Sequence, residues 1–198
     1  MTPPSAAFKE VTGAILIGGH SRRLGRDKVL LPHEGKPLAV HLHGLLAGLF
    51  PRVFLVGHPR PELVDLGLTC IPDLVPDMGV LGGIYTALVS AATPHVFITG
   101  ADMPFLTTSL ISRILDQRHL ADAVIPKGSR GLEPLCAVYS TSCADTLRQN
   151  IEKGRLKITA ALGSLKILSP TVMPEEGDQD PFININYPED VGVLEKDD

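Results

Sequence analysis

A loop rich in glycine and arginine follows the first apolar segment of the chain. Residues 16–28 read LIGGHSRRLGRDK. The adjacent Gly18 and Gly19 let the backbone approach a ligand closely and present amide N–H groups to it. Three arginines and a lysine follow, and guanidinium and ammonium groups bind phosphates. The loop fits neither the Walker A pattern nor the GxGxxG fingerprint. It predicts a polyphosphate site, with a solvated basic turn as the alternative.

Asp102 is the second feature that points to chemistry. It follows the apolar run at 95–99, in the sequence ITGADMPF. Mg²⁺ commonly binds one or two carboxylates and completes its octahedron with phosphate oxygens and water. A lone carboxylate beside a triphosphate therefore suits a magnesium ligand. The alternative is an aspartate that caps the next helix.

Asp73 precedes a second glycine-rich stretch, MGVLGG at 78–83, which opens a helix. The N-terminus of a helix offers unpaired amide donors and the positive end of the helix dipole. This stretch predicts a contact with an anion or a base edge. A tight turn with closely packed glycines is the alternative.

These segments together resemble a known family. The run LIGGHSRRLGRDKVLLPHEGKPL resembles the loop of nucleotidyltransferases of the glycosyltransferase-A type. The most similar are the molybdenum cofactor guanylyltransferases, with the pattern LAGGxSxRMGxDKxLL and then GxPL. The segments around Asp73 and Asp102 resemble the family's IxD, GPLxG and CDMPF. The sequence departs from these patterns at Ile17 (usually Ala), Leu24 (Met), Val80 (Pro) and Ala101 (Cys).

The resemblance assigns roles to particular residues. It implies that the guanosine is held by Leu16, Gly18, Gly19, Asp73 and Gly82. It implies that the catalytic groups are Arg23 and Lys28, which hold the triphosphate, and Asp102, which binds Mg²⁺. The segment FININYPED resembles the family's FxNxNxPED and adds Asn184 and Asn186. These two alternate along a predicted strand and so share a face, although they would equally satisfy a strand end and cap the final helix.

The implied activity is transfer of GMP from Mg·GTP to the terminal phosphate of a molybdopterin-type molybdenum cofactor, with release of pyrophosphate. The expected cofactor is Mg²⁺, and the expected substrates are GTP and the molybdopterin cofactor. Transient contact with molybdoenzymes or other cofactor-biosynthesis proteins is expected, and contact with nucleic acid or a membrane is not. Three alternatives stay open: a cytidylyl- or sugar-1-phosphate nucleotidyltransferase, a GTP-binding cofactor carrier without transferase activity, and a dinucleotide-binding oxidoreductase, which the missing GxGxxG disfavours.

Other polar residues carry weaker signals. The run GLEPLCAVY at 131–139 resembles the family's acceptor side. Basic residues near it would bind the pterin phosphate or form a solvated face: Lys127, Arg130, Lys153, Arg155 and Lys157. The seven histidines are spread along the chain. His41 and His43 stand two apart on a predicted helix, so they face different directions and form no metal pair with each other.

Apolar runs alternate with segments of helical spacing. We expect strands at 11–17, 52–56, 69–71, 95–99, 123–125, 135–139, 165–168 and 182–185, and helices at 37–49, 62–66, 81–92, 107–118, 142–153, 158–162 and 189–195. This order predicts an α/β, Rossmann-like three-layer α/β/α fold whose central sheet is mostly parallel with one antiparallel strand. Ligands of such sheets bind beyond the carboxyl ends of the strands.

Composition agrees with an ordinary globular domain. The 198 residues, 44% hydrophobic and 20% charged, predict one globular domain. We expect a flexible leader at 1–10, and the resemblance implies that 11–198 is a single nucleotidyltransferase domain. A net charge of -4 argues against a general nucleic-acid binder. Three cysteines are too few and too irregularly spaced for a disulfide framework. With no apolar run of about 20 residues and no secretory signal, we expect a cytoplasmic protein.

Overall fold

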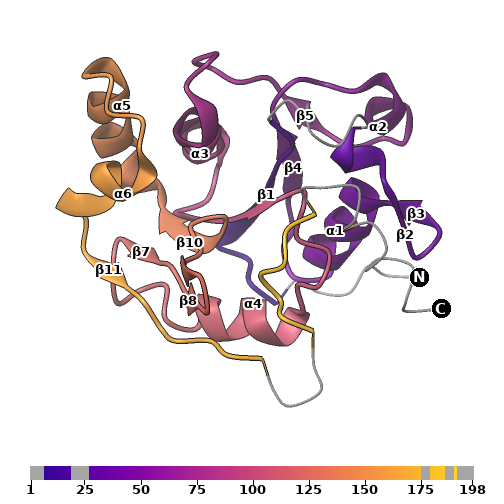
Figure 1. Cartoon of the computed structure of the whole chain (residues 1–198). Coiled ribbons are helices and arrows are strands. Elements are labelled where there is room, and N and C mark those ends of the chain that lie inside the picture. The colour runs from indigo at the N-terminus through magenta and orange to yellow at the C-terminus, as the bar shows by residue number, and fades with distance from the viewer. Residues whose placement is uncertain (1–6, 19–26, 175–178, 186–189, 191–198) are drawn as a thin grey trace.

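The computed structural model describes residues 7–18, 27–174, 179–185 and 190. A seven-stranded sheet of order β11-β7-β10-β6-β1-β4-β5 forms its centre (Figure 1). Strand β10 runs antiparallel to both β6 and β7, and the other neighbouring pairs are parallel. This confirms the predicted sheet with one antiparallel strand. The strands are β1 (Val11–Leu16), β4 (Val53–Val56), β5 (Cys70–Ile71), β6 (His95–Gly100), β7 (Ala123–Val124), β10 (Cys136–Ser140) and β11 (Ile167–Leu168).

Helices cover both faces of this sheet (Figure 1). One face carries α1 (Leu38–Ala47), α2 (Pro61–Asp65) and α4 (Thr108–Leu115), and the other carries α3 (Gly79–Ser90), α5 (Ala144–Glu152) and α6 (Ile158–Ala161). Side chains of a strand alternate between its faces. Along β1, Val11 and Ile15 enter the core with α1 and α4, whereas Ala14 and Leu16 enter the core with α3. The three-layer α/β/α prediction is confirmed.

The chain changes direction within the sheet next to β1. It passes from β1 to β4 and β5 on one side and then crosses to β6 on the other. The carbonyl of Leu16 accepts a hydrogen bond from the N–H of Ala101 at 3.0 Å, so the two strand ends stay together. A crevice opens at such a switch point in parallel sheets. The topology therefore places a ligand site beyond the ends of β1 and β6.

Short elements were missing from the sequence-based prediction. Two hairpins, β2 (Pro32–His33) with β3 (Lys36–Pro37) and β8 (Lys127–Gly128) with β9 (Gly131–Leu132), have strands of only two residues. Such strands show no hydrophobic periodicity. Single-turn helices at η1 (Lys28–Leu30), η2 (Thr141–Cys143) and η3 (Leu162–Ser164) complete the described elements.

The predicted strand at 182–185 is wrong. Residues 181–182 form a turn and 183–185 have no regular structure. The carboxylate of Asp180 accepts a hydrogen bond from the Phe182 N–H at 2.9 Å, and its carbonyl accepts one from the Ile183 N–H at 3.1 Å. This local turn competes with strand pairing. Of the predicted helix at 189–195, only residue 190 lies within the described part of the chain.

The segment before β1 packs on the core. Phe8 donates its N–H to the Leu49 carbonyl at 3.1 Å, and the centroids of the Phe8 and Phe50 rings are 6.4 Å apart. Residues 1–6 lie outside the described part, and the boundary of the leader stays a prediction. Among the helices described, none has the length and apolar character that crossing a bilayer requires.

Candidate active site

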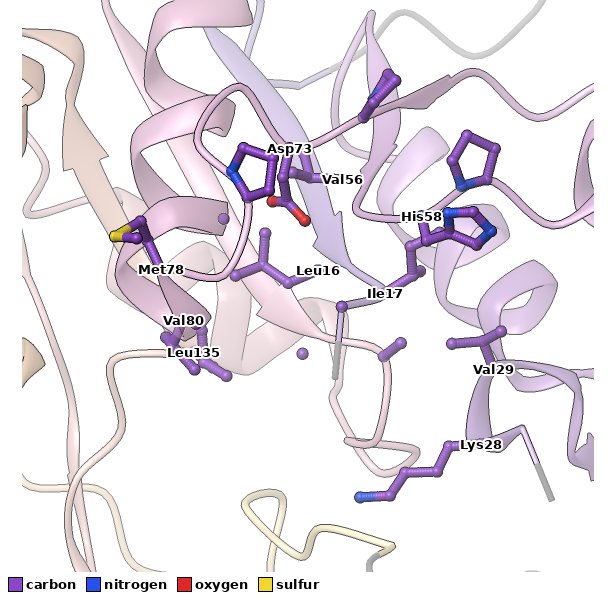
Figure 2. A pocket seen from close by; sticks show the side chains of 18 of the residues that line it. Leu16, Ile17, Lys28, Val29, Val56, His58, Asp73, Met78, Val80 and Leu135 are labelled. Atoms are coloured by element: carbon purple, nitrogen blue, oxygen red, sulfur yellow. The ribbon is translucent and has the colours of Figure 1, made fainter. Parts of the chain in front are cut away.

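A cavity of about 800 Å³ opens at the carboxyl ends of β1 and β6 (Figure 2). Its lining comes from segments within 16–18, 27–29, 56–60, 72–83 and 100–102, and from Leu135. These segments are far apart in the sequence, and the crevice beside β1 brings them together. The cavity thus lies where we expect a ligand to bind, beyond the carboxyl ends of the strands.

Lys28 and Asp102 meet in this cavity. The Lys28 Nζ lies 3.4 Å from Asp102 Oδ2, and the two side chains are 19% and 25% exposed. Asp102 follows the end of β6, and Lys28 begins η1. The fold thus pairs a cation and a carboxylate that are separated by 74 positions. Both stay accessible to a charged ligand in the cavity.

The turn that carries Lys28 is fixed by its neighbours. Asp27 Oδ1 accepts a hydrogen bond from the Val29 N–H at 3.3 Å and caps η1. Asp27 Oδ2 accepts a second one from Arg60 Nε at 2.8 Å. Arg60 also donates to the carbonyl of His58. Sequence reasoning missed Arg60 because nothing in the local sequence relates it to Asp27.

Asp73 points into the part of the cavity that lies opposite Lys28 (Figure 2). A Cβ on Gly18 would stand 4.0 Å from Asp73 Oδ2, so the carboxylate lies beside the end of β1. Burial raises the pKa of Asp73. Gly57 has a φ of +133°, and a Cβ there would lie 2.8 Å from the Gly18 nitrogen. Glycine at 57 is thus required for the close approach of two chain segments beside the cavity.

The loop over the cavity is anchored to α3. The N–H of Leu74 donates to Thr86 Oγ1 at 3.0 Å, and that hydroxyl donates to the Gly82 carbonyl at 2.8 Å. The first turn of α3 faces the cavity through Gly79, Val80 and Gly83. This end of the helix therefore presents its dipole and amide groups to a ligand.

Two predicted guanosine contacts have different surroundings. The side chain of Leu16 lines the cavity, and its carbonyl is bonded to Ala101. Gly82 is not among the lining residues. A Cβ there would lie 2.8 Å from Met78 Cβ and 3.0 Å from the Val75 carbonyl oxygen. Gly82 lets the 75–78 loop pack on α3, and its neighbour Gly83 lines the cavity.

The C-terminal segment reaches Asp102 through its backbone. The N–H of Ile185 donates to the carbonyl of Asp102 at 2.9 Å. Asn184 is half-buried and adjacent, and it is not among the residues that line the cavity. Three other predicted site residues, Gly19, Arg23 and Asn186, lie outside the described residues.

A smaller cavity of about 450 Å³ adjoins the first. It shares residues 77–80 and Leu135 with the main cavity and adds Pro134, Leu156 and Ile158. Arg130, one of the basic residues on this side of the fold, donates to the carbonyl of Phe182. Burial raises the pKa of Glu133, which the nearby Arg130 partly offsets.

Comparison with known proteins finds a family model and several relatives that are similar to this chain. The model of the MobA-like NTP transferase domain matches residues 13–165. A molybdenum cofactor guanylyltransferase from Desulfosudis oleivorans is 30% identical over 191 residues, 93% of this chain and 94% of that protein. The crystal structure of molybdopterin-guanine dinucleotide biosynthesis protein A from Archaeoglobus fulgidus superposes with a TM-score of 0.78 at 28% identity, covering 93% of this chain and 97% of that one.

The family match spans the segments that build the cavity from β1 to α6. The chain belongs to the MobA-like NTP transferase family and is a nucleotidyltransferase.

Proposed function

We propose that the chain transfers GMP from Mg·GTP to the terminal phosphate of a molybdopterin-type molybdenum cofactor. An oxygen of the acceptor phosphate attacks the α-phosphorus of GTP in line. The bond between that phosphorus and the oxygen bridging to the β-phosphorus breaks, and pyrophosphate leaves with the bonding electrons. The observation that carries the proposal is the pairing of Lys28 with Asp102 at the switch point of the sheet. The names of the relatives support the choice of guanine and of this acceptor.

The protein groups act by position and charge. The Lys28 ammonium lies in the cavity, where it would neutralise charge that builds on the α-phosphate and the leaving pyrophosphate. Arg23, in the same loop, would add a guanidinium to the triphosphate. No side chain has to form a covalent intermediate, because holding both substrates in line already removes much of the barrier.

The residues present fit magnesium brought in with the nucleotide. Asp102 is a carboxylate in the cavity, and a Cβ on Gly100 would stand 2.6 Å from its Oδ1, so glycine at 100 leaves room for that oxygen. One carboxylate suffices when phosphate oxygens and water complete the coordination. When bound, the cation would polarise the phosphoryl group and shield its charge.

The part of the cavity around Asp73, opposite Lys28, suits the guanine base. Guanine presents N–H donors on one edge, and the Asp73 carboxylate beside Gly18 is an acceptor for them. The amide groups at the start of α3 face the same space. The adjoining cavity at Leu135, Leu156 and Ile158 gives the acceptor an apolar surface next to the reacting phosphates.

Calorimetric titration with GTP, CTP, ATP and UTP in Mg²⁺ tests the nucleotide. We expect selective binding of GTP that weakens sharply in Lys28→Met. The matched control is Lys9→Met, because Lys9 is exposed and is not a lining residue of the cavity. Preference for CTP would transfer the proposal to the cytidylyltransferases, and absence of nucleotide binding would refute it.

Pyrophosphate release with a molybdopterin acceptor tests the reaction. We expect one pyrophosphate for each guanine dinucleotide formed, and both products should depend on GTP and acceptor together. GTP binding without release in the presence of the acceptor would instead support a cofactor carrier.

A further inference from the structure

The β2–β3 hairpin packs on α1 (Figure 1). Two histidines and a glutamate gather at this contact. His33 is the last residue of β2, Glu34 begins the hairpin turn, and His41 lies in the first turn of α1. One ligand atom from each lies within 4.8 Å of the other two. Within the part of the chain that the structure describes, no other three His, Cys, Asp or Glu side chains bring their ligand atoms so close together. It is separate from the nucleotide cavity, which none of the three lines.

The three side chains are graded from the interior to the surface. His33 is 3% exposed, whereas the side chains of His41 and Glu34 are 21% and 62% exposed. His41 Nδ1 stands 3.1 Å from Glu34 Oε2. The rings of His33 and His41 meet edge to face, with centroids 4.6 Å apart. A small cation can therefore reach the group from solvent and find its deepest ligand already in place.

The buried ring has an unpartnered polar atom. His33 Nδ1 is buried and has no hydrogen-bond partner among the described residues. Phe105 packs edge-on against the same ring, with centroids 6.1 Å apart, and holds its position. A buried polar atom without a partner costs free energy. A cation bound through Nδ1 of His33 would give that atom a polar partner.

We propose that His33, Glu34 and His41 form a binding site for a transition-metal cation of the Zn²⁺ class. Two imidazoles and one carboxylate are ligands that Zn²⁺ and its neighbours accept, with water in the fourth position. Mg²⁺ prefers about six oxygen ligands and does not suit this set.

The distances agree with a site that closes on the ion. Tetrahedral bonds of about 2.0–2.1 Å place donor atoms about 3.4 Å apart. His41 Nδ1 and Glu34 Oε2 are already 3.1 Å apart, close to this spacing. The widest separation, within 4.8 Å, has to shrink. Rotation of the exposed Glu34 side chain and of the partly exposed His41 ring allows this.

Metal binding would join the hairpin to the helix. The hairpin follows the turn that carries Lys28, and the Leu38 N–H at the start of α1 donates to the Leu31 carbonyl at 2.8 Å. A cation that binds only the folded arrangement stabilises it by mass action. Metal binding would therefore stabilise the segment between Lys28 and α1 in its folded position.

Zinc titration of the full chain, stripped of metal and free of affinity tags, tests the site. We expect one Zn²⁺ per chain and a rise in Tm of roughly 5–10 °C at about 100 times the Kd. Co²⁺ should give the visible absorption of a four-coordinate ion, and Mg²⁺ at the same concentration should leave Tm unchanged. Glu34→Gln and His41→Gln should each weaken Zn²⁺ binding at least about tenfold.

The controls separate this site from other zinc ligands. Glu34 is exposed, so Glu34→Gln leaves the folded state intact and its Tm without metal should equal that of the parent. His43→Gln removes a histidine of the same helix that is not in the group, and it should bind Zn²⁺ like the parent. Absence of zinc binding, binding unchanged in both Glu34→Gln and His41→Gln, or displacement of zinc by Mg·GTP would each overturn the proposal.

Discussion

Replacing Gly100 with alanine should slow turnover while the protein stays folded. Gly100 ends β6, and its φ lies outside the left-handed region, so the backbone accepts alanine. The new Cβ would stand 2.6 Å from Asp102 Oδ1 and 3.5 Å from Leu135 Cδ1. The first contact is too short and the second is ordinary. The substitution therefore acts mainly on the carboxylate of Asp102.

The size of the effect follows from these distances. Ordinary contacts begin at 3.4 Å, so the carboxylate has to move by about 0.8 Å or more. A displacement of about 1 Å in a reacting group costs about 10²-fold in rate. We expect kcat for pyrophosphate release to fall about 10²-fold in Gly100→Ala. Because the side chain of Asp102 is 25% exposed and can rotate, Tm should change little.

The assay compares four variants with the parent. Gly44→Ala is the matched control, since a Cβ at Gly44 has nothing within 4 Å and adds a helix-favouring residue to α1. Asp102→Asn removes the charge itself, and we expect a loss of about 10²–10³ in kcat. In the double variant, Gly100→Ala should add little to Asp102→Asn, because the displaced group no longer contributes its charge. A rate near that of the parent for Gly100→Ala, or fully multiplicative losses, would refute the reasoning.

Further substitutions probe the rest of the cavity. Lys28→Met removes a charge that lies 3.4 Å from Asp102 Oδ2. Coulomb's law gives this interaction about 1–5 kcal/mol for effective dielectric constants between about 80 and 20. We expect kcat to fall about 10²–10³-fold in a pyrophosphate assay. Burial raises the pKa of Asp73 above 3.8, so the folded state holds a proton where the unfolded state has lost it, and stability falls as the pH rises through that window. Asp73→Asn should therefore raise Tm at pH 7, with a gain that shrinks toward pH 3.8, and should weaken GTP binding in calorimetry. Gly57→Ala should lower both Tm and GTP affinity, and the folded state should lose about 1–3 kcal/mol of stability. The reason is that φ at 57 is +133° and the new Cβ would lie 2.8 Å from the Gly18 nitrogen. Unchanged Tm and GTP affinity would contradict the packing described.

Most of the sheet and the long helices were predictable from local pattern. The apolar run that becomes β1 and the spacing that becomes α4 each carry enough residues to define a period. Thr107 caps α4, accepting a hydrogen bond from the Leu110 N–H at 3.2 Å. The strand predicted at 182–185 failed because Asp180 stabilises a turn that apolar alternation does not reveal.

The glycine-rich and acidic segments were recognisable because their chemistry is local. A loop that carries Gly18 and Lys28, and the residue Asp102 at a strand end, are visible as residue types in a fixed order. Their order in the chain also carries the family resemblance, which the comparison with known proteins confirms.

Only the tertiary structure decided which of these groups meet. Lys28 Nζ lies 3.4 Å from Asp102 Oδ2, Arg60 donates a hydrogen bond to Asp27, and Gly100 leaves room for an oxygen of Asp102. These contacts form because the crossovers of the sheet bring distant segments to one edge. His41 likewise lies beside His33 through the packing of a hairpin on a helix, and not beside its sequence neighbour His43. Sequence periodicity records which face of an element is apolar. It does not record which polar residues of different elements approach one another, and that depends on packing over the whole domain.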